Sequence, residues 1–231
     1  MPSALYLRVA GAVAAALVAL AAIFLLSNDF GDPSAGGAAA SPGEPKFGKA
    51  GRYASDVGSP GPGEEAPAIR LQSSHGSLFD LAEERGGNVL LYFQEGLMCQ
   101  PCWDQLTAIE AEPEAFGALG IDRVVSITTD PADLVRQKVA DEGISTPVLS
   151  DEDWSVSGAY RTNTDEHVMM QGMGGMHNGH SFILVGPDGR IRWRADYGGP
   201  PEFTMFVPVA DLAADMRAGL RGGRGGVRGG P

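Results

Sequence analysis

The chain has 231 residues, with 17 basic and 29 acidic side chains and a formal net charge of −12 at neutral pH. This acidic balance argues against nucleic acid as a partner. Two cysteines are too few for a fold that depends on disulfide staples, and the central part of the chain, about 150 residues, is long enough for one domain with its own hydrophobic core.

The first 26 residues are expected to form a membrane anchor or signal segment. Residues 9–26 carry no charged side chain and are rich in alanine, leucine and valine. That length is close to the minimum for a membrane-spanning helix. Arg8 precedes the run and Asp29 follows it, which predicts that the N-terminus stays inside. The expected location is therefore the cell membrane, single-pass, with the domain on the extracytoplasmic side; secretion after signal cleavage is the alternative.

Two further segments have compositions that cannot build a core. Residues 27–63 are rich in glycine, proline, serine and alanine and are predicted to be a flexible linker. Residues 221–231 repeat glycine and arginine and are predicted to be a disordered tail. The folded domain is therefore expected at residues 64–220.

Within the domain, predicted strands alternate with predicted helices. The expected elements are, in chain order, a hairpin over 65–81, a buried strand at 88–93, a helix over 100–117 broken or kinked at Pro113, a buried strand at 124–128, a helix from 131 to 143, an extended piece at 147–151, a short helix at 154–160, a hairpin of 181–185 with 190–194, and a helix over 209–220. This order predicts an α/β fold with a mixed central sheet flanked by helices.

The two cysteines of the chain, Cys99 and Cys102, stand between the strand at 88–93 and the start of the following helix. A helix N-terminus carries partial positive charge and favours a thiolate, which is the nucleophile in disulfide exchange. We expect Cys99 to be the more exposed nucleophile and Cys102 the resolving cysteine. A purely structural disulfide closing so short a loop would add only about 2 kcal/mol, and a zinc site would need two more ligands.

A second unusual segment, residues 167–180, contains three of the four histidines and four of the eight methionines. It is rich in glycine and is expected to be a loop that hangs over the cysteines. Thiolate, imidazole and thioether groups together suit Cu(I). Copper held by Cys99, Cys102 and His180, with Met173, Met176 and His177 nearby, is therefore one prediction. A flexible loop that contacts partner proteins or packs on the domain is the alternative.

Three more residues are expected beside the cysteines. His180 could tune the Cys99 thiolate as a nearby base or cation. Glu95 lies close to Cys99 in the sequence and could move protons, although a solvated carboxylate is an equal alternative. Trp103 is expected to form a wall of the site.

These features together resemble a known family. The segments Glu65-Ala66-Pro67, 89–93 with Cys99 and Cys102, 143–151 and 182–189 occur in the order typical of the redoxin form of the thioredoxin-like fold. That branch holds the AhpC/TSA peroxiredoxins and the membrane-tethered thiol–disulfide oxidoreductases. The resemblance covers residues 58–217 and implies a thioredoxin-like fold with a redox-active cysteine pair.

The resemblance also shows departures. Peroxiredoxins carry a proline seven residues and a threonine or serine three residues before the peroxidatic cysteine. Tyr92 and Gly96 hold those places before Cys99, and Glu95 and Cys99 hold them before Cys102. Peroxidase activity is therefore the weaker expectation.

The stretch 179–189 resembles a second family, the Sco copper chaperones, which bind copper with two cysteines and a histidine. Sco cysteines are spaced C-x-x-x-C, whereas this chain has C-x-x-C.

The leading prediction is an enzyme: a membrane-tethered, extracytoplasmic thiol–disulfide oxidoreductase that uses Cys99 and Cys102. It requires no cofactor, with copper as an optional ligand. Its expected partners are exported thiol or disulfide proteins and, through the N-terminal helix, the membrane. The alternatives are a Sco-like copper-binding chaperone and a thiol peroxidase.

Overall fold

The computed structural model describes residues 47–49, 54–56, 58–162, 178–198 and 204–222. The chain divides into two compact units, Met1–Glu44 and Pro45–Pro231, and every described residue belongs to the second. The predicted anchor at 1–26, most of the predicted linker, the loop residues 163–177 and the tail residues 223–231 lie outside the described residues.

Strands and helices alternate along the described chain. The elements are β1 (Phe47–Lys49), β2 (Ala54–Asp56), β3 (Arg70–Ser73), β4 (Leu78–Asp80), the 3₁₀ helix η1 (Leu81–Glu84), β5 (Val89–Phe93), α2 (Gln100–Ala111), α3 (Pro113–Gly117), β6 (Arg123–Thr128), α4 (Ala132–Glu142), β7 (Val148–Ser150), α5 (Ser155–Tyr160), β8 (Ser181–Val185), β9 (Ile191–Asp196) and α7 (Val209–Gly222).

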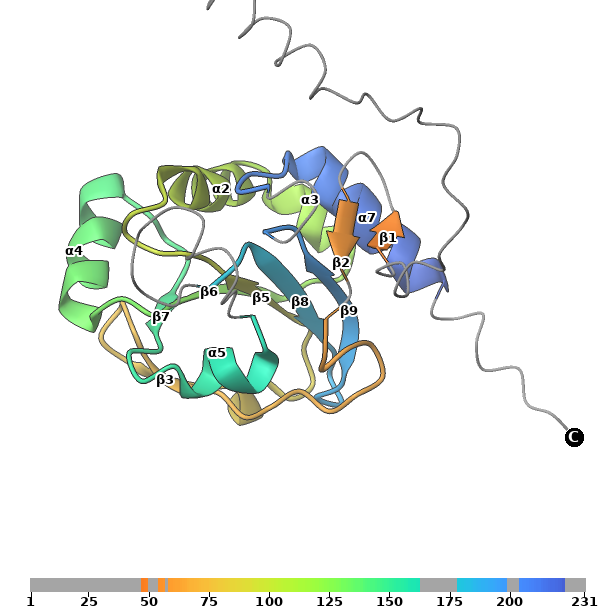
Figure 1. Cartoon of the computed structure of the whole chain (residues 1–231), viewed down its shortest axis with the longest axis horizontal. Helices are drawn as coiled ribbons and strands as arrows, with labels where there is room; N and C mark the ends of the chain where they lie inside the picture. The colour runs from red at the N-terminus through yellow and green to blue at the C-terminus, as the bar shows by residue number, and fades with distance from the viewer. Residues whose placement is uncertain (1–46, 50–53, 57, 163–177, 199–203, 223–231) are drawn as a thin grey trace, which may run out of the picture. The chain divides into compact units, whose positions relative to one another are not determined.

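The strands described here form one mixed sheet in the order β1-β2-β9-β8-β5-β6-β7-β3-β4. β5 lies at its centre, parallel to β6 and antiparallel to β8. β6 and β7 are also parallel, and β3 and β9 extend the sheet with antiparallel pairs. Figure 1 shows α2, α3 and α7 along one side of this sheet and α5 on the other. The predicted thioredoxin-like α/β fold with a flanked mixed sheet is confirmed.

The central strand, β5, is apolar on both faces and therefore needs a packed layer on each side of the sheet. All five residues of β5 are apolar or aromatic and buried, as expected of a strand between two layers of helices. Leu90 and Tyr92 point into the core under α2, α3, α4 and α7, while Val89, Leu91 and Phe93 point into the core under α5 and η1. The carboxyl end of β5 therefore emerges in the middle of the molecule, where the next helix carries the cysteines.

The predicted elements of the domain are confirmed with small changes of boundary. The predicted helix over 100–117 is two helices, because Pro113 starts a new helix, α3, immediately after α2 ends. α4 ends before Gly143, which adopts a left-handed backbone with φ of +67°.

The fold begins earlier than residue 64. β1 and β2 lie inside the stretch predicted to be a flexible linker, and β2 pairs with β9 through Asp56 and Asp196. The fully buried guanidinium of Arg194 donates hydrogen bonds to the carbonyl oxygens of Pro60 (3.0 Å) and Tyr160 (2.8 Å). Composition does not indicate these contacts, because they are backbone strand pairing and a hydrogen bond to a backbone carbonyl.

The predicted location at the cell membrane needs correction. Across the ranges that the structure describes, we find no helix with the length and apolar character needed to cross a bilayer. The run at 9–26 that prompted the prediction of a single-pass anchor lies outside those ranges. The predicted single-pass location in the cell membrane is therefore not supported.

A buried carboxyl under α7 predicts a pH-dependent stability. Tyr197 donates a hydrogen bond to one oxygen of Asp215 (2.8 Å), while the other oxygen is buried without a hydrogen-bond partner. Burial, and then the charge of Asp211, raise the pKa of Asp215 from 3.8 to about 6. The folded protein holds this proton more tightly than the unfolded chain does, so stability falls as the pH rises from 3.8 through 6.

We expect Asp215→Asn to stabilise the protein at pH 8 by on the order of 1–3 kcal/mol, because the variant has no buried charge there. The gain should vanish towards pH 4, where Asp215 itself is protonated. Urea unfolding at both pH values measures the difference, with Asp141→Asn on the exposed face of α4 as the control for loss of one charge. Equal stability of wild type and Asp215→Asn at pH 8 would contradict the prediction.

Candidate active site

The two cysteines form a disulfide across the first turn of α2, with their Cα atoms 5.3 Å apart. Cys99 is the residue that precedes the helix and Cys102 lies in its first turn. Cys99 is 5 % exposed and Cys102 is 0 % exposed, so Cys99 is the more accessible sulfur by a small margin. The helix N-terminus favours negative charge at this position, which stabilises a thiolate when the bond is opened.

The loop between β5 and α2 is fixed around Gly96, whose φ is +94°. Its carbonyl oxygen accepts hydrogen bonds from the backbone N–H of Cys99 (3.0 Å) and from the indole N–H of Trp103 (3.0 Å). The Asp130 carboxylate accepts the backbone N–H of Leu97 (2.7 Å). These contacts hold the turn that delivers Cys99 to the start of the helix.

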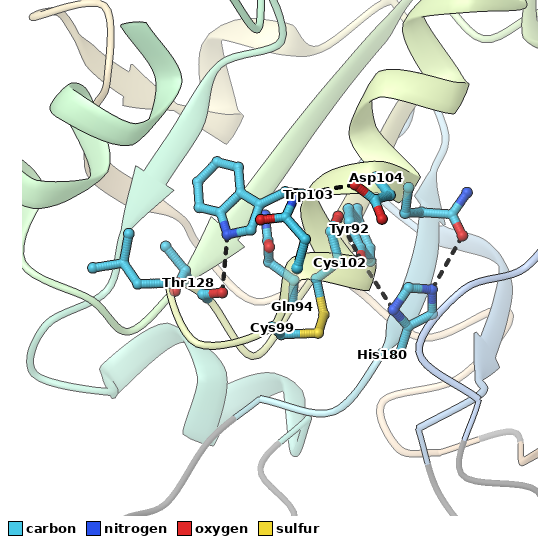
Figure 2. The surroundings of a disulfide bond; sticks show 12 residues. Tyr92, Gln94, Cys99, Cys102, Trp103, Asp104, Thr128 and His180 are labelled. Atoms are coloured by element: carbon cyan, nitrogen blue, oxygen red, sulfur yellow. Dashed lines mark hydrogen bonds between the residues drawn. A yellow bond between two sulfur atoms is a disulfide. The ribbon is translucent and has the colours of Figure 1, made fainter. Parts of the chain in front are cut away.

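Asp130 and its neighbour Thr128 were missed in the sequence. Thr128 ends β6, and its hydroxyl donates to the Asp130 carboxylate (2.6 Å) and lies close to Gly96 of the cysteine loop (Figure 2). The sequence could have indicated Thr128 as a site residue, because it is a polar residue at the carboxyl end of β6. Parallel strands such as β5 and β6 present their carboxyl ends at the same edge of the sheet.

Trp103 is fully buried in α2, and its role as a wall of the site stays a prediction. Its indole N–H is used by Gly96, and the ammonium group of Lys138 lies 5.5 Å from its ring centroid. Trp103 therefore packs α2 and α4 against the cysteine loop.

His180 lies at the site, but not as an exposed base. The residue is completely buried immediately before β8. One ring nitrogen, Nδ1, is 2.9 Å from the Tyr92 hydroxyl, and the other, Nε2, is 3.3 Å from the side-chain oxygen of Gln105. Figure 2 shows the labelled His180 ring with a dashed line from one nitrogen towards Tyr92. Burial lowers the pKa of His180 to about 3, so the ring is neutral at neutral pH while the disulfide is intact.

Tyr92 and Gln105, also missed in the sequence, complete this buried cluster. The Tyr92 hydroxyl is 3.3 Å from the carbonyl oxygen of Cys102, and its ring stacks on Phe182 with centroids 4.5 Å apart. The Gln105 oxygen accepts the backbone N–H of Val207 (2.7 Å). Tyr92 looked like an ordinary core residue because it lies inside an apolar strand.

Glu95 lies in the loop between β5 and α2 and is half-buried. Its charge acts on the Tyr92 phenol. Burial first, and then Glu95, raise the pKa of the Tyr92 phenol well above its usual value. Tyr92 is therefore neutral, and a role for Glu95 in proton transfer stays a prediction.

The predicted copper site is not supported. Both ring nitrogens of His180 are engaged in hydrogen bonds, and the two sulfurs are bonded to each other. In the part of the chain that the structure describes, no group of three or more histidine, cysteine, aspartate or glutamate side chains is arranged to hold a metal ion. Met173, Met176 and His177 lie outside that part. The predicted resemblance to the Sco copper chaperones is not shown.

The fold and the cysteine pair at the start of the helix after the central strand define a thiol-redox protein of the thioredoxin-like class. The model of the AhpC/TSA family matches residues 62–194, and the chain belongs to that family. The predicted resemblance to the redoxins is thereby confirmed, and so is the coarser functional prediction of a redoxin-type thiol oxidoreductase.

Individual relatives agree with this assignment. The chain is 28 % identical over 129 residues to peroxiredoxin Bcp of Escherichia coli strain K12, a match that covers 56 % of this chain and 81 % of the relative. Among solved structures, peroxidoxin BcpB from Mycobacterium tuberculosis matches with a TM-score of 0.54 at 19 % identity, covering 73 % of this chain and 98 % of that one. The reduced 2-Cys peroxiredoxin of Plasmodium vivax matches with a TM-score of 0.54 at 18 % identity, covering 71 % and 83 %. At these identities the solved structures support the fold alone.

Proposed function

We propose that the protein is a thiol peroxidase of the AhpC/TSA family whose Cys99–Cys102 pair cycles between dithiol and disulfide. The observation that carries the proposal is the disulfide across the first turn of α2, formed by the two cysteines of the chain. The relatives support the peroxide substrate, because Bcp is described as a peroxiredoxin.

The proposed cycle starts with the Cys99 thiolate. Its sulfur attacks the terminal oxygen of a hydroperoxide, the O–O bond breaks, and the alcohol or water leaves with a proton, which leaves Cys99 as a sulfenic acid. The Cys102 sulfur then attacks the Cys99 sulfur, the S–S bond forms, and water leaves. An external dithiol, such as a small redox protein, reduces the disulfide through a mixed disulfide on Cys99.

The local geometry suits the first of these steps. A sulfur that precedes a helix lies next to the unpaired N–H groups of the first turn, which stabilise negative charge. Because Cys102 lies in the same turn, the second step needs no separate resolving element from elsewhere in the chain. Cys102 is buried, so the reductant is expected to approach Cys99.

Thiol–disulfide exchange with partner proteins is the second candidate, and one observation favours it. The place three residues before Cys99 is held by Gly96, which has no hydroxyl to orient a peroxide, and the carbonyl of Gly96 is used by Cys99 and Trp103. Exchange needs only a nucleophilic thiol and an adjacent resolving thiol. The direction of electron flow would then follow from the reduction potential of the pair.

One experiment separates the two functions. Reduced protein is mixed in a stopped-flow instrument with hydrogen peroxide and, separately, with a disulfide-bonded model protein such as insulin. A peroxidase should react with peroxide at least about a hundredfold faster than free cysteine at the same pH, the effect expected of preorganised donors around the reacting atom. A peroxide rate equal to that of free cysteine, with rapid exchange on insulin, would reject the peroxidase and support the second candidate.

A further inference from the structure

A chain of buried hydrogen bonds joins the backbone of Cys102 to a histidine. The Tyr92 hydroxyl lies between the carbonyl oxygen of Cys102 (3.3 Å) and Nδ1 of His180 (2.9 Å). Nε2 of His180 contacts the side-chain oxygen of Gln105 (3.3 Å), and that oxygen accepts the N–H of Val207 (2.7 Å). Figure 2 shows the first part of this chain beside the disulfide. The side chains of Tyr92, His180 and Gln105 are fully buried, so they hydrogen-bond to one another and not to bulk water.

The contacts determine where the protons are in the neutral cluster. The N–H of Val207 can only donate, so the Gln105 atom facing it is the carbonyl oxygen. That oxygen can only accept, so Nε2 of His180 carries the ring proton. Nδ1 is then bare and accepts the O–H of Tyr92, which leaves the Cys102 carbonyl without the phenol proton.

The same atoms can hold one more proton without losing a hydrogen bond. When Nδ1 is protonated it donates to the Tyr92 oxygen, and the phenol proton turns to the Cys102 carbonyl, which is already within 3.3 Å. Nε2 continues to donate to Gln105. A buried imidazolium usually leaves donors unpaired, whereas this arrangement satisfies both of them.

The charges around the His180 imidazole determine whether it binds a second proton. Among the described residues, the groups shown in contact with the ring are Tyr92 from β5, Gln105 from α2 and Phe182 from β8. Next to these lie the Cys102 and Val207 backbones, and Tyr197 after β9, whose backbone N–H donates to the His180 carbonyl oxygen. None of these side chains is charged while the disulfide is intact. Three carboxylates act on the neighbours: Glu95 on Tyr92, and Asp215 and Asp211 on Tyr197.

An imidazolium in this cluster therefore needs a nearby anion, and reduction creates one. Opening the disulfide leaves the Cys102 sulfur in the buried first turn of α2. Because burial disfavours an isolated thiolate, this sulfur is ionised only if a nearby group takes its proton. A buried anion and a histidine joined to the same residue stabilise each other's charged forms.

We propose that reduction of the Cys99–Cys102 disulfide is coupled to uptake of a proton by His180, with the Tyr92 hydroxyl turning from His180 to the Cys102 carbonyl. An external dithiol supplies two electrons, which break the S–S bond and leave two thiolates, and it releases two protons. One of these enters the His180 cluster and pairs with the Cys102 thiolate. The other protonates Cys99 or passes to water. His180 and Tyr92 are thus positioning residues that take the proton which would otherwise stay on the Cys102 sulfur, so that this sulfur is ionised after reduction.

The inference rests on the proposed redox cycle of the cysteine pair, but not on whether its substrate is a peroxide or a disulfide. The experiment uses a chemical dithiol, dithiothreitol, with the full chain. If the disulfide cannot be opened and reformed, the proposed function fails. If it cycles while His180 stays neutral, the proton coupling alone fails.

The decisive measurement is nuclear magnetic resonance of the histidine side-chain nitrogens between pH 5 and 8, in both redox states. In the oxidised protein His180 should be neutral throughout. In the reduced protein it should be protonated at pH 5. The Cys102 sulfur of the reduced protein should be ionised at a pH where, in a variant lacking the coupling, it keeps that proton as a thiol, and the ultraviolet absorbance of the thiolate measures the difference. A neutral His180 in the reduced protein at pH 5 would overturn the proposal.

Three variants make the test specific. Tyr92→Phe keeps the ring that stacks on Phe182 but removes the hydroxyl, so it should lose the proton uptake while the disulfide still forms. His180→Asn should lose it as well and identifies the resonance. His75→Gln changes an exposed histidine and should behave as wild type. An unchanged thiolate absorbance in both reduced Tyr92→Phe and reduced His180→Asn would also overturn the proposal.

Discussion

Replacing Cys99 by serine should lower the thiol-dependent turnover of the protein by about 10³-fold or more, to the level of the uncatalysed reaction. Cys99 is the sulfur at the helix start and the more accessible of the two, and the chain has no third cysteine to replace it. A serine hydroxyl at this position is not ionised at neutral pH and cannot form a disulfide with Cys102. Turnover of peroxide with a dithiol reductant measures the loss.

Cys102→Ser is the matched variant, because it removes the second sulfur and leaves the first in place. It should keep the first chemical step and accumulate a stable product on Cys99: a sulfenic acid with peroxide, or a mixed disulfide with a protein disulfide. Mass spectrometry after trapping with dimedone distinguishes the two. If Cys99→Ser accumulates the adduct on Cys102 and Cys102→Ser does not react, the roles of the cysteines are the reverse of those proposed.

Gly96→Ala should cost at least about 3 kcal/mol of unfolding free energy. The φ of +94° is one that an L-residue adopts only with strain, about 1–2 kcal/mol. In addition, a Cβ at this position would collide with the Asp130 carboxylate and the Thr128 hydroxyl. If the Asp130 carboxylate turns away from the new methyl group, it loses the hydrogen bond from the Leu97 N–H that holds the cysteine loop, so the reactivity of Cys99 should fall together with stability. Urea unfolding and the rate of Cys99 alkylation in reduced protein measure the two effects.

Gly76→Ala separates the two causes. Gly76 also has a positive φ, of +81°, but a Cβ there would meet no atom within 4 Å. It should therefore show the backbone strain alone, a loss of about 1–2 kcal/mol, and leave the Cys99 rate unchanged. Equal losses in the two variants would contradict the collision with Asp130.

Most of the fold could be predicted from local patterns. The apolar runs at β5, β6 and β8 can be buried only between layers, and Pro113 and Gly143 end helices through their own backbone restrictions. The part that was missed, β1, β2 and the segment at Pro60, is bound through backbone pairing and through Arg194 from a distant strand. No local pattern reports such a contact.

The candidate site divides in the same way. Cys99 and Cys102 could be found because their spacing and their place before a helix are both local. The surroundings of His180 could not, because its partners Tyr92 and Gln105 lie 88 and 75 residues away in the chain. The prediction of copper treated the imidazole as available, whereas tertiary contacts occupy both of its nitrogens.

By itself, the sequence determined the α/β class, the order of the elements and the reactive pair, since these follow from side-chain periodicity, from proline and glycine, and from the chemistry of two thiols. Only the tertiary structure decided the environment of that pair: a loop fixed by Gly96 and Asp130, and a neutral histidine buried behind Tyr92. The physical reason is that burial and hydrogen bonding, which set the charge of His180 and the access to Cys102, depend on strands and helices brought together from distant parts of the chain.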